Sequence, residues 1–225
     1  VARGPDFSPG FPQWRAAVAP SAIAPRGVQT FTAEGLKDIP PPRALEKDEI
    51  ATIVEEFRSA ASNAKAAGFD GVEVHGANGY LLDQFAKDGA NQRSDAYGGS
   101  IENRARLMLE ATKAVVDEIG AGRTGIRISP VTPANGVSTS DAQPLFDYIV
   151  DQLNALDLVY LHVIEGATGG PRDIAPFDYA SLRKRFKNAY IANNGFDLAL
   201  AERHLQDDAA DLVAFGRPFI ANPDL

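Results

Sequence analysis

The chain has 225 residues, a formal net charge of −8, a sequence pI of about 4.9 and no cysteine. This length fits a single domain with a sizeable core, and the absence of cysteine excludes disulfides and thiolate metal sites. The acidic balance argues against nucleic acid as a partner, because a polyanion requires a basic surface.

The sequence also bears on location. No apolar run approaches the roughly 18 residues that a membrane-spanning helix needs, and the first residues lack the apolar core of a signal peptide. We therefore expect no membrane partner and a soluble, cytoplasmic protein. The chain does not start with methionine, and we expect it to begin inside a longer protein.

Residues 1–46 are rich in proline and glycine and have weak hydrophobic periodicity. A loop of this length is uncommon inside a compact domain and is usually functional or flexible. The segment also carries large apolar side chains that suit a loop packed over other parts of the fold: Phe7, Phe11, Trp14, Ile23 and Phe31. We expect residues 1–225 to form one domain, with 1–46 as a long excursion loop.

From residue 48 onward, segments with helical periodicity alternate with short apolar segments that predict strands. The first helix is expected to end at Gly68, and Ser100 is the expected N-cap of the second. Helices are expected at about 48–67, 101–119, 142–156, 179–186 and 198–205. Strands are expected at 71–75, 125–129, 158–164, 190–193 and 211–215.

Strands that alternate with helices predict a parallel sheet with right-handed crossovers. A doubly wound sheet is one such fold, but no Gly-x-Gly-x-x-Gly motif follows any of the strands. We favour an α/β fold of the (β/α)8 TIM barrel type, because polar residues follow nearly every strand and the carboxyl ends of barrel strands meet at one mouth. Five strands do not close a barrel, so we expect a partial barrel, with about three further strands before residue 1.

The densest group of polar residues follows the strand at 71–75. His75 ends that strand, Asn78 lies three residues later, and Tyr80 follows two residues after that. A lone histidine is more often structural, but three hydrogen-bonding side chains at one barrel mouth favour a functional site. Two donors on one oxygen stabilise developing negative charge, and a tyrosine, with an ordinary pKa of about 10, can donate a proton at neutral pH.

The segment from His75 to Phe85, His-Gly-Ala-Asn-Gly-Tyr-Leu-Leu-Asp-Gln-Phe, resembles the substrate-binding strand and loop of the Old Yellow Enzyme family, and 91–106 resembles the adjoining hallmark. The resemblance implies a TIM barrel that binds FMN and reduces α,β-unsaturated carbonyl or nitro compounds with NAD(P)H. It implies that His75 and Asn78 bind the substrate oxygen and that Tyr80 protonates the alkene carbon. Within 91–106 we expect ion pairs and hydrogen bonds that fix the loop, not direct catalysis.

Arg127 lies inside the otherwise apolar strand at 125–129. A buried unpaired arginine is costly, so it needs an anionic or acceptor-rich partner. One candidate is the carboxylate of Glu73, in an internal ion pair. The family resemblance implies instead that Arg127 lies beside the N1/C2 carbonyl edge of the flavin. His162 is expected to line the barrel or its core and His204 to lie on the surface, and the histidines are too scattered for a metal site.

Loops that contain glycine follow the last two strands. Barrel loops in these positions often bind phosphate, glycine lets the backbone approach an anion, and arginine binds phosphate oxygens bidentately. We therefore expect Asn194, Gly195, Gly216 and Arg217 to bind the FMN phosphate. The stretch 215–225 resembles the last strand of the family and the segment after it, whereas Asn194 replaces a glycine that relatives often have.

The family is longer at both ends than these 225 residues, so we keep three hypotheses open. The first is an FMN-dependent, NAD(P)H-oxidising reductase whose partner is a small electrophilic alkene or nitro compound. The second is a non-catalytic half-barrel that needs a complementing chain, with exposed strand edges that favour association, including homo-oligomers. The third is a flavin-free isomerase or lyase for phosphorylated substrates, which the His75–Tyr80 segment argues against.

Overall fold

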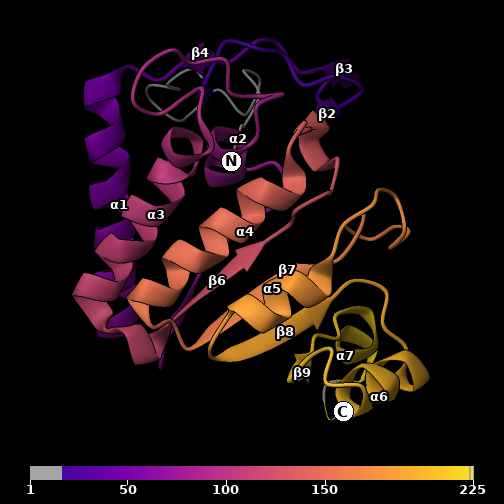
Figure 1. Ribbon diagram of the computed structural model, residues 1–225. Helices are drawn as coiled ribbons and strands as arrows, with labels where there is room; N and C mark the ends of the chain where they lie inside the picture. Colours follow the sequence, from indigo (N-terminus) through magenta and orange to yellow (C-terminus); the bar gives the residue numbers. More distant parts are fainter. Residues whose placement is uncertain (1–16, 223, 225) are drawn as a thin grey trace.

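The computed structural model describes residues 17–222 and residue 224, and its central feature is a curved sheet of five parallel strands (Figure 1). The strands are β5 (Val72–Gly76), β6 (Thr124–Ile128), β7 (Tyr160–Ile164), β8 (Ala189–Asn193) and β9 (Leu212–Val213). Each strand pairs with the next one in sequence. This order is that of a barrel wall, because a doubly wound sheet would reverse direction at one point. The five predicted strands are confirmed.

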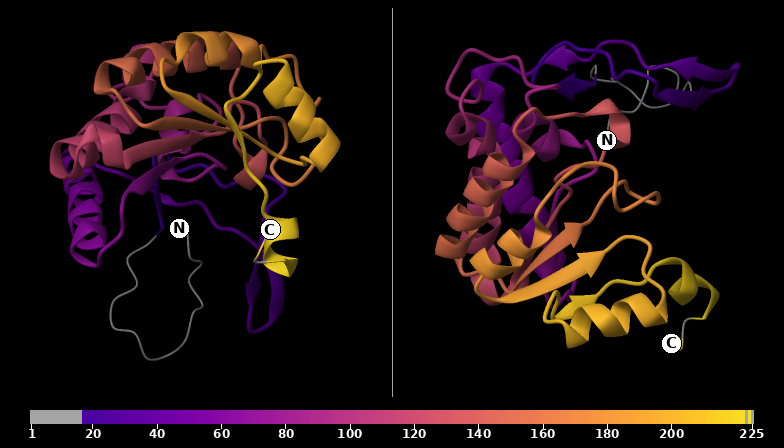
Figure 2. Two further views of the ribbon diagram at one scale, coloured as in Figure 1. Left: turned by 90° about the horizontal axis from the view of Figure 1, so that it is seen from below. Right: turned by 45° about the vertical axis from the view of Figure 1, so that its right-hand side comes forward.

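Helices lie outside the sheet and form an arc around its convex face, as Figure 2 shows. The arc contains α1 (Lys47–Ala66), α3 (Ile101–Ile119), α4 (Ala142–Leu153), α5 (Tyr179–Arg185) and α6 (Leu198–Gln206). Two short helices lie after strand ends instead: α2 (Leu81–Ala86) follows β5 and α7 (Arg217–Ala221) follows β9. The predicted cap of α3 is confirmed, since the Ser100 side chain accepts a hydrogen bond from the N–H of Asn103. None of the described helices combines the length and apolar character needed to cross a membrane.

The alternation of side chains along the strands decides what the two faces of the sheet contain. Residues that point outward are apolar and join the helices in one hydrophobic cluster, including Val74, Ile126, Ile128, Leu161, Val163 and Ala192. Most intervening positions of β5, β6 and β7, on the concave face, carry polar side chains, and the strand register pairs His75 with Arg127 and Arg127 with His162. The sheet thus has an apolar outer face and a polar row across its inner face.

Residues 17–46 contain more regular structure than the predicted loop. The strands are β1 (Val18–Ala19), β2 (Gln29–Thr32), β3 (Gly35–Asp38) and β4 (Arg43–Ala44). β2 and β3 form an antiparallel hairpin, and β1 pairs in parallel with β4. These strands have only two to four residues each, too few to give a periodic signal. Phe7, Phe11 and Trp14 lie outside the described residues.

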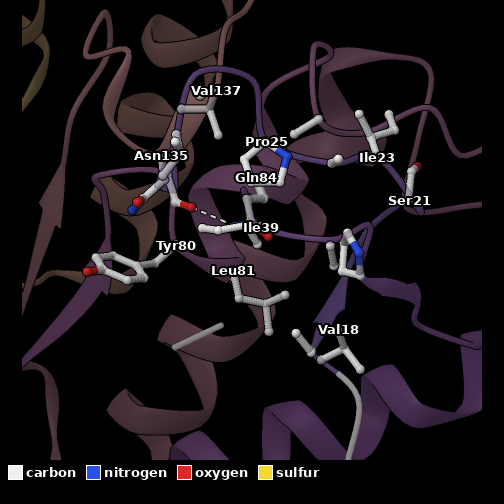
Figure 3. Close-up of a pocket in the computed structure, with 18 of the residues that line it drawn as sticks. Val18, Ser21, Ile23, Pro25, Ile39, Tyr80, Leu81, Gln84, Asn135 and Val137 are labelled. Atoms are coloured by element: carbon white, nitrogen blue, oxygen red, sulfur yellow. Dashed lines mark hydrogen bonds between the residues drawn. The ribbon is translucent and has the colours of Figure 1, made fainter. Parts of the chain in front are cut away.

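A cavity of about 340 Å³ separates this segment from α2 and from the loop after β6. Its walls include Ile23, Pro25, Ile39 and Val137, and Tyr80 lies at its border. Figure 3 shows the Tyr80 hydroxyl directed away from Ile39 and Pro25. The part of 17–46 that lines the cavity therefore packs against the back of the turn that carries Tyr80.

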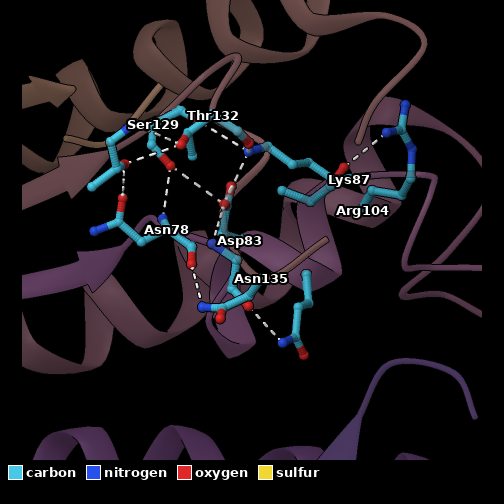
Figure 4. A network of polar contacts seen from close by, with 11 residues as sticks. Asn78, Asp83, Lys87, Arg104, Ser129, Thr132 and Asn135 are labelled. Atoms are coloured by element: carbon cyan, nitrogen blue, oxygen red, sulfur yellow. Dashed lines mark hydrogen bonds and ion pairs between the residues drawn. The ribbon is translucent and has the colours of Figure 1, made fainter. Parts of the chain in front are cut away.

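A buried ion pair anchors α2 beneath the sheet's mouth (Figure 4). Lys87 Nζ lies 3.0 Å from Asp83 Oδ2, and their side chains are 1% and 0% exposed. Lys87 also donates to the Ser129 carbonyl at 2.8 Å, and Asp83 accepts from the N–H of Gly79 at 2.8 Å. The pair thus connects the loop after β5 to the loop after β6.

We predict that Lys87→Met lowers the free energy of unfolding by about 3–5 kcal/mol, because it leaves the Asp83 carboxylate buried without its cation. Urea unfolding followed by circular dichroism measures this loss. The matched control is Lys113→Met, which removes an exposed i,i+4 pair with Asp117 and should cost less than about 1 kcal/mol. Equal effects of the two substitutions would contradict the anchoring role.

Candidate functional site

The structure brings His75 and Tyr80 together at the carboxyl end of β5. Their ring centroids are 5.3 Å apart, and Tyr80 remains 38% exposed. Burial of the imidazole, with a smaller contribution from the Arg127 charge, lowers the pKa of His75. His75 is therefore neutral at pH 7, so its ring offers one N–H donor without a positive charge.

Asn78 occupies a left-handed backbone position with φ of 59°, which asparagine tolerates better than most residues. Its N–H donates to Ser129 Oγ at 2.7 Å, and its side-chain Oδ1 accepts from Thr168 Oγ1 at 2.6 Å. Figure 4 shows the amide nitrogen of Asn78 directed away from this network. Because Oδ1 is occupied, the group that Asn78 offers a ligand is the Nδ2 donor.

The hydroxyl residues that hold Asn78 were not predicted from the sequence. Thr132 and Thr168 follow β6 and β7, their hydroxyl oxygens lie 3.0 Å apart, and the Thr168 N–H donates to Thr132 Oγ1 at 3.0 Å. Only their position just after a strand could have indicated that these threonines belong to the site. Nothing in the sequence pairs Asn78 with a threonine 90 residues away.

Arg127 extends from β6 onto the concave face, next to Glu73 and His162. Its Nη2 lies 3.4 Å from His162 Nε2, and its Nε lies 3.8 Å from Glu73 Oε1. The Nε is buried and has no hydrogen-bond partner among the described residues. Arg127 and Glu73 thus form only a loose contact and not the close internal ion pair that was one of the two alternatives. Among the described residues, the guanidinium is incompletely bonded.

The carboxylate of Glu73 makes a closer contact with His162 than with Arg127. His162 Nδ1 lies 2.8 Å from Glu73 Oε2. Burial by itself would raise the pKa of Glu73, but the hydrogen bond from His162 and the charges around it lower that pKa overall. His162, with a side chain only 8% exposed, lines the inner face as predicted.

Comparisons with known proteins agree with this geometry. Residues 13–225 match the NADH:flavin oxidoreductase / NADH oxidase family. The chain is 49% identical over 188 residues to a 12-oxophytodienoate reductase 1 of Oryza sativa subsp. japonica, and this match covers 82% of this chain and 49% of that protein. It is 45% identical over 197 residues to a chanoclavine-I aldehyde reductase of Penicillium roqueforti, with 84% and 53% covered.

Solved structures show the same fold. Morphinone reductase superposes with a TM-score of 0.87 at 43% identity, over 94% of this chain and 58% of that one. The old yellow enzyme homologue from Zymomonas mobilis gives a TM-score of 0.86 at 37% identity, over 93% and 59%. The chain belongs to the NADH:flavin oxidoreductase / NADH oxidase family.

Membership confirms the resemblance to the Old Yellow Enzyme family and the fold class, so β5–β9 are strands of a (β/α)8 barrel. The chain spans about half the length of the curated relatives it matches.

The segment 91–106, which resembles a family hallmark, has the predicted structural role. Arg93 pairs with Asp95 and donates to the Pro20 carbonyl at 3.0 Å. Arg104 is 3% exposed and pairs with Asp141. These bonds tie the loop to the N-terminal segment and to the start of α4.

The loops after the last strands have room for a ligand. A Cβ added at Gly195 or Gly216 would meet no atom within 4 Å, so a ligand can approach the backbone at both. One added at Gly169 would lie 3.7 Å from Arg217 Nη2. The loop after β7 therefore lies next to the predicted phosphate-binding arginine, and phosphate binding at these residues stays a prediction.

Asn194 stands where the family resemblance led us to expect a glycine, and the structure shows which groups its side chain contacts. Its φ is 106° and it is 5% exposed. Its Nδ2 donates to the carbonyls of Glu165 and Ala167 at 2.7 and 2.8 Å, and its Oδ1 accepts from Gly169 N–H at 3.1 Å. The side chain is turned into the protein, so only the backbone of Asn194 is available to an anion.

Arg172 strengthens this connection between the two loops. It pairs with the buried Glu165, donates to the Asn194 carbonyl at 2.9 Å, and lies 4.2 Å from the ring centre of Phe196. Burial raises the pKa of Glu165, although the Arg172 charge opposes the shift. His204, predicted to lie on the surface, is half-buried: its side chain is 21% exposed and its Nε2 lies 3.1 Å from Arg172 Nη2.

We predict that Asn194→Gly increases deuterium uptake in residues 166–172, because glycine accepts the positive φ but removes the four side-chain hydrogen bonds, which include one to the Gly170 carbonyl at 3.3 Å. Hydrogen–deuterium exchange with mass spectrometry measures it. Asp208→Gly is the control, since Asp208 also has a positive φ, of 54°, but an exposed side chain. Unchanged uptake at 166–172 in Asn194→Gly would show that the loop is held by other contacts.

Proposed function

We propose that this chain carries the substrate-binding and much of the flavin-binding surface of an FMN-dependent reductase of activated alkenes, with NAD(P)H as hydride donor. The observation that carries the proposal is the contact between the His75 and Tyr80 rings at the end of β5, where His75 pairs in register with Arg127 and the Asn78 amide in the following turn has its Oδ1 bonded to Thr168. Two reductases among the relatives support it, and one solved relative is morphinone reductase in complex with tetrahydroNAD.

The residues present fit FMN. The buried Nε of Arg127 has no partner among the described residues and suits an acceptor such as a ring carbonyl or nitrogen. The open space at Gly195 and Gly216 next to Arg217 suits a phosphate, which arginine binds through several N–H groups. When bound, FMN supplies hydride transfer between nicotinamide and the substrate.

The residues at the mouth divide the remaining tasks. The His75 N–H and Asn78 Nδ2 donate to the carbonyl or nitro oxygen of the substrate and stabilise the negative charge that develops there. The bond from Thr168 to Asn78 Oδ1 keeps the donor side of the amide directed to the ligand. Tyr80 Oη holds the proton that the alkene carbon receives. Because His75 is neutral, Tyr80 is the acid and His75 the hydrogen-bond donor.

A second proposal is that these tasks need a complementing segment. β5 and β9 form the two edges of the described sheet, and its inner face carries His75, Arg127 and His162. A further segment or a second copy of the chain paired along either edge would cover that face. Under this proposal the chain alone binds no flavin, whatever its residues contribute to the completed barrel.

Retention of FMN by the chain decides between the two proposals. The purified chain is mixed with excess FMN, desalted and examined for the visible absorption of protein-bound flavin. Stoichiometric flavin supports the first proposal. No retained flavin removes the first proposal as a property of this chain alone and supports the second.

We predict that Tyr80→Phe leaves reduction of the enzyme-bound flavin by NADPH unchanged and slows alkene reduction about 10²–10⁴-fold, because only the second half-reaction needs the proton. Stopped-flow absorbance follows each half-reaction, with cyclohexenone as the alkene. Tyr148→Phe, on the outer helix α4, is the control. Normal alkene reduction by Tyr80→Phe would remove the assignment of Tyr80 as the proton donor.

A further inference from the structure

We propose that His162 is a positioning residue that holds Glu73 away from Arg127, so that the Arg127 guanidinium stays available to an acceptor-bearing ligand on the concave face. The inference rests on the proposed function in one respect, since the ligand there is FMN. The positions of Glu73, His162 and Arg127 are independent of it.

Three charged or polar side chains compete at this point of the inner face. Glu73 and Arg127 lie on neighbouring strands β5 and β6, and His162 lies directly beside Arg127 on β7. An arginine and a carboxylate in such proximity ordinarily form a short, two-pronged pair. Here the closest approach is 3.8 Å, from Arg127 Nε to Glu73 Oε1.

His162 accounts for the missing pair. Its Nδ1 lies 2.8 Å from Glu73 Oε2, the distance of a full hydrogen bond. Glu73 is thus turned toward His162. Tyr160 is a further neighbour of the same carboxylate: burial, the Glu73 charge and a hydrogen bond to Glu73 raise the pKa of Tyr160 to about 12.

The partners of the His162 ring fix its tautomer. Its Nε2 faces two donors, Asn193 Nδ2 at 2.8 Å and Arg127 Nη2 at 3.4 Å. A guanidinium has no acceptor, so Nε2 must be the unprotonated nitrogen and Nδ1 must carry the hydrogen that is donated to Glu73. Because both ring nitrogens are engaged and the side chain is 8% exposed, His162 does not itself meet the substrate.

The consequence appears at Arg127. Its Nε is buried and unpaired among the described residues, an unfavourable state for a donor in the protein alone. A ligand with a carbonyl or ring nitrogen relieves that state when it binds. His162 therefore leaves the Arg127 Nε–H available to a ligand, whereas a direct Arg127–Glu73 pair would engage this donor.

The test combines His162→Phe with Glu73→Gln. We expect His162→Phe to weaken FMN binding about tenfold or more, because the released Glu73 carboxylate pairs with Arg127 and takes up a charge-assisted hydrogen bond. The double variant, His162→Phe with Glu73→Gln, should recover most of the affinity. A purely structural role of His162 predicts no recovery, and that result would overturn the proposal.

Nuclear magnetic resonance of the chain without flavin gives a separate readout. We expect ¹⁵N shifts that place the His162 hydrogen on Nδ1, and an Arg127 Nε–H signal that moves downfield in His162→Phe and returns in the double variant. A hydrogen on Nε2, or an Arg127 signal that does not respond, would overturn the inference. The tautomer is measured in the unaltered protein, so the test does not depend on the folding of a variant. If the unaltered chain retains no FMN, the proposed function fails for this chain while these signals still decide the role of His162.

Discussion

The buried pair of Asp83 and Lys87 is the interaction on which the site depends. It ties α2 to Gly79 and to Ser129, and Ser129 in turn accepts the N–H of Asn78. The turn at 77–80 is thereby set against the loop after β6, and Asn78 reaches the loop after β7 through Thr168. A charge pair without solvent contact is a costly way to build an anchor, but it fixes the direction of three loops at once.

The inner, concave face of the sheet carries polar and charged side chains. Outward side chains of the strands build the core with the helices, so the inner face is free to carry groups that a core would exclude. The row His75, Arg127 and His162 occupies neighbouring register positions. These side chains affect one another's bonding: His162 binds the neighbouring Glu73, the Arg127 Nε has no partner among the described residues, and the Arg127 charge helps keep His75 neutral. The mouth and the inner face thus form one electrostatic unit.

Local signals predicted the parts of the structure that depend on local physics. Helical periodicity, the Ser100 cap and the apolar strands gave elements close to those observed, and α4 stops as an α-helix at Leu153, with a 3-10 turn over Asn154–Leu156. The polar residues at 75–80 were recognisable because they follow a strand. Contacts between loops that are far apart in the sequence leave no local pattern from which they could be predicted. The Thr168–Asn78 bond, the inward side chain of Asn194 and the contact of His204 with Arg172 depend on how the fold brings distant strands together. The hairpin at 29–38 was missed because its strands are short.

We propose that one chain presents a ring-binding inner face and a phosphate-binding edge to the same ligand. Isothermal titration calorimetry with FMN and with riboflavin, which lacks the phosphate, tests it most directly. We expect FMN to bind about tenfold or more tightly than riboflavin, because Arg217 donates charge-assisted hydrogen bonds to the phosphate, and we expect Arg217→Ala to remove most of this difference. Equal affinities for the two flavins, or a difference that survives in Arg217→Ala, would contradict it.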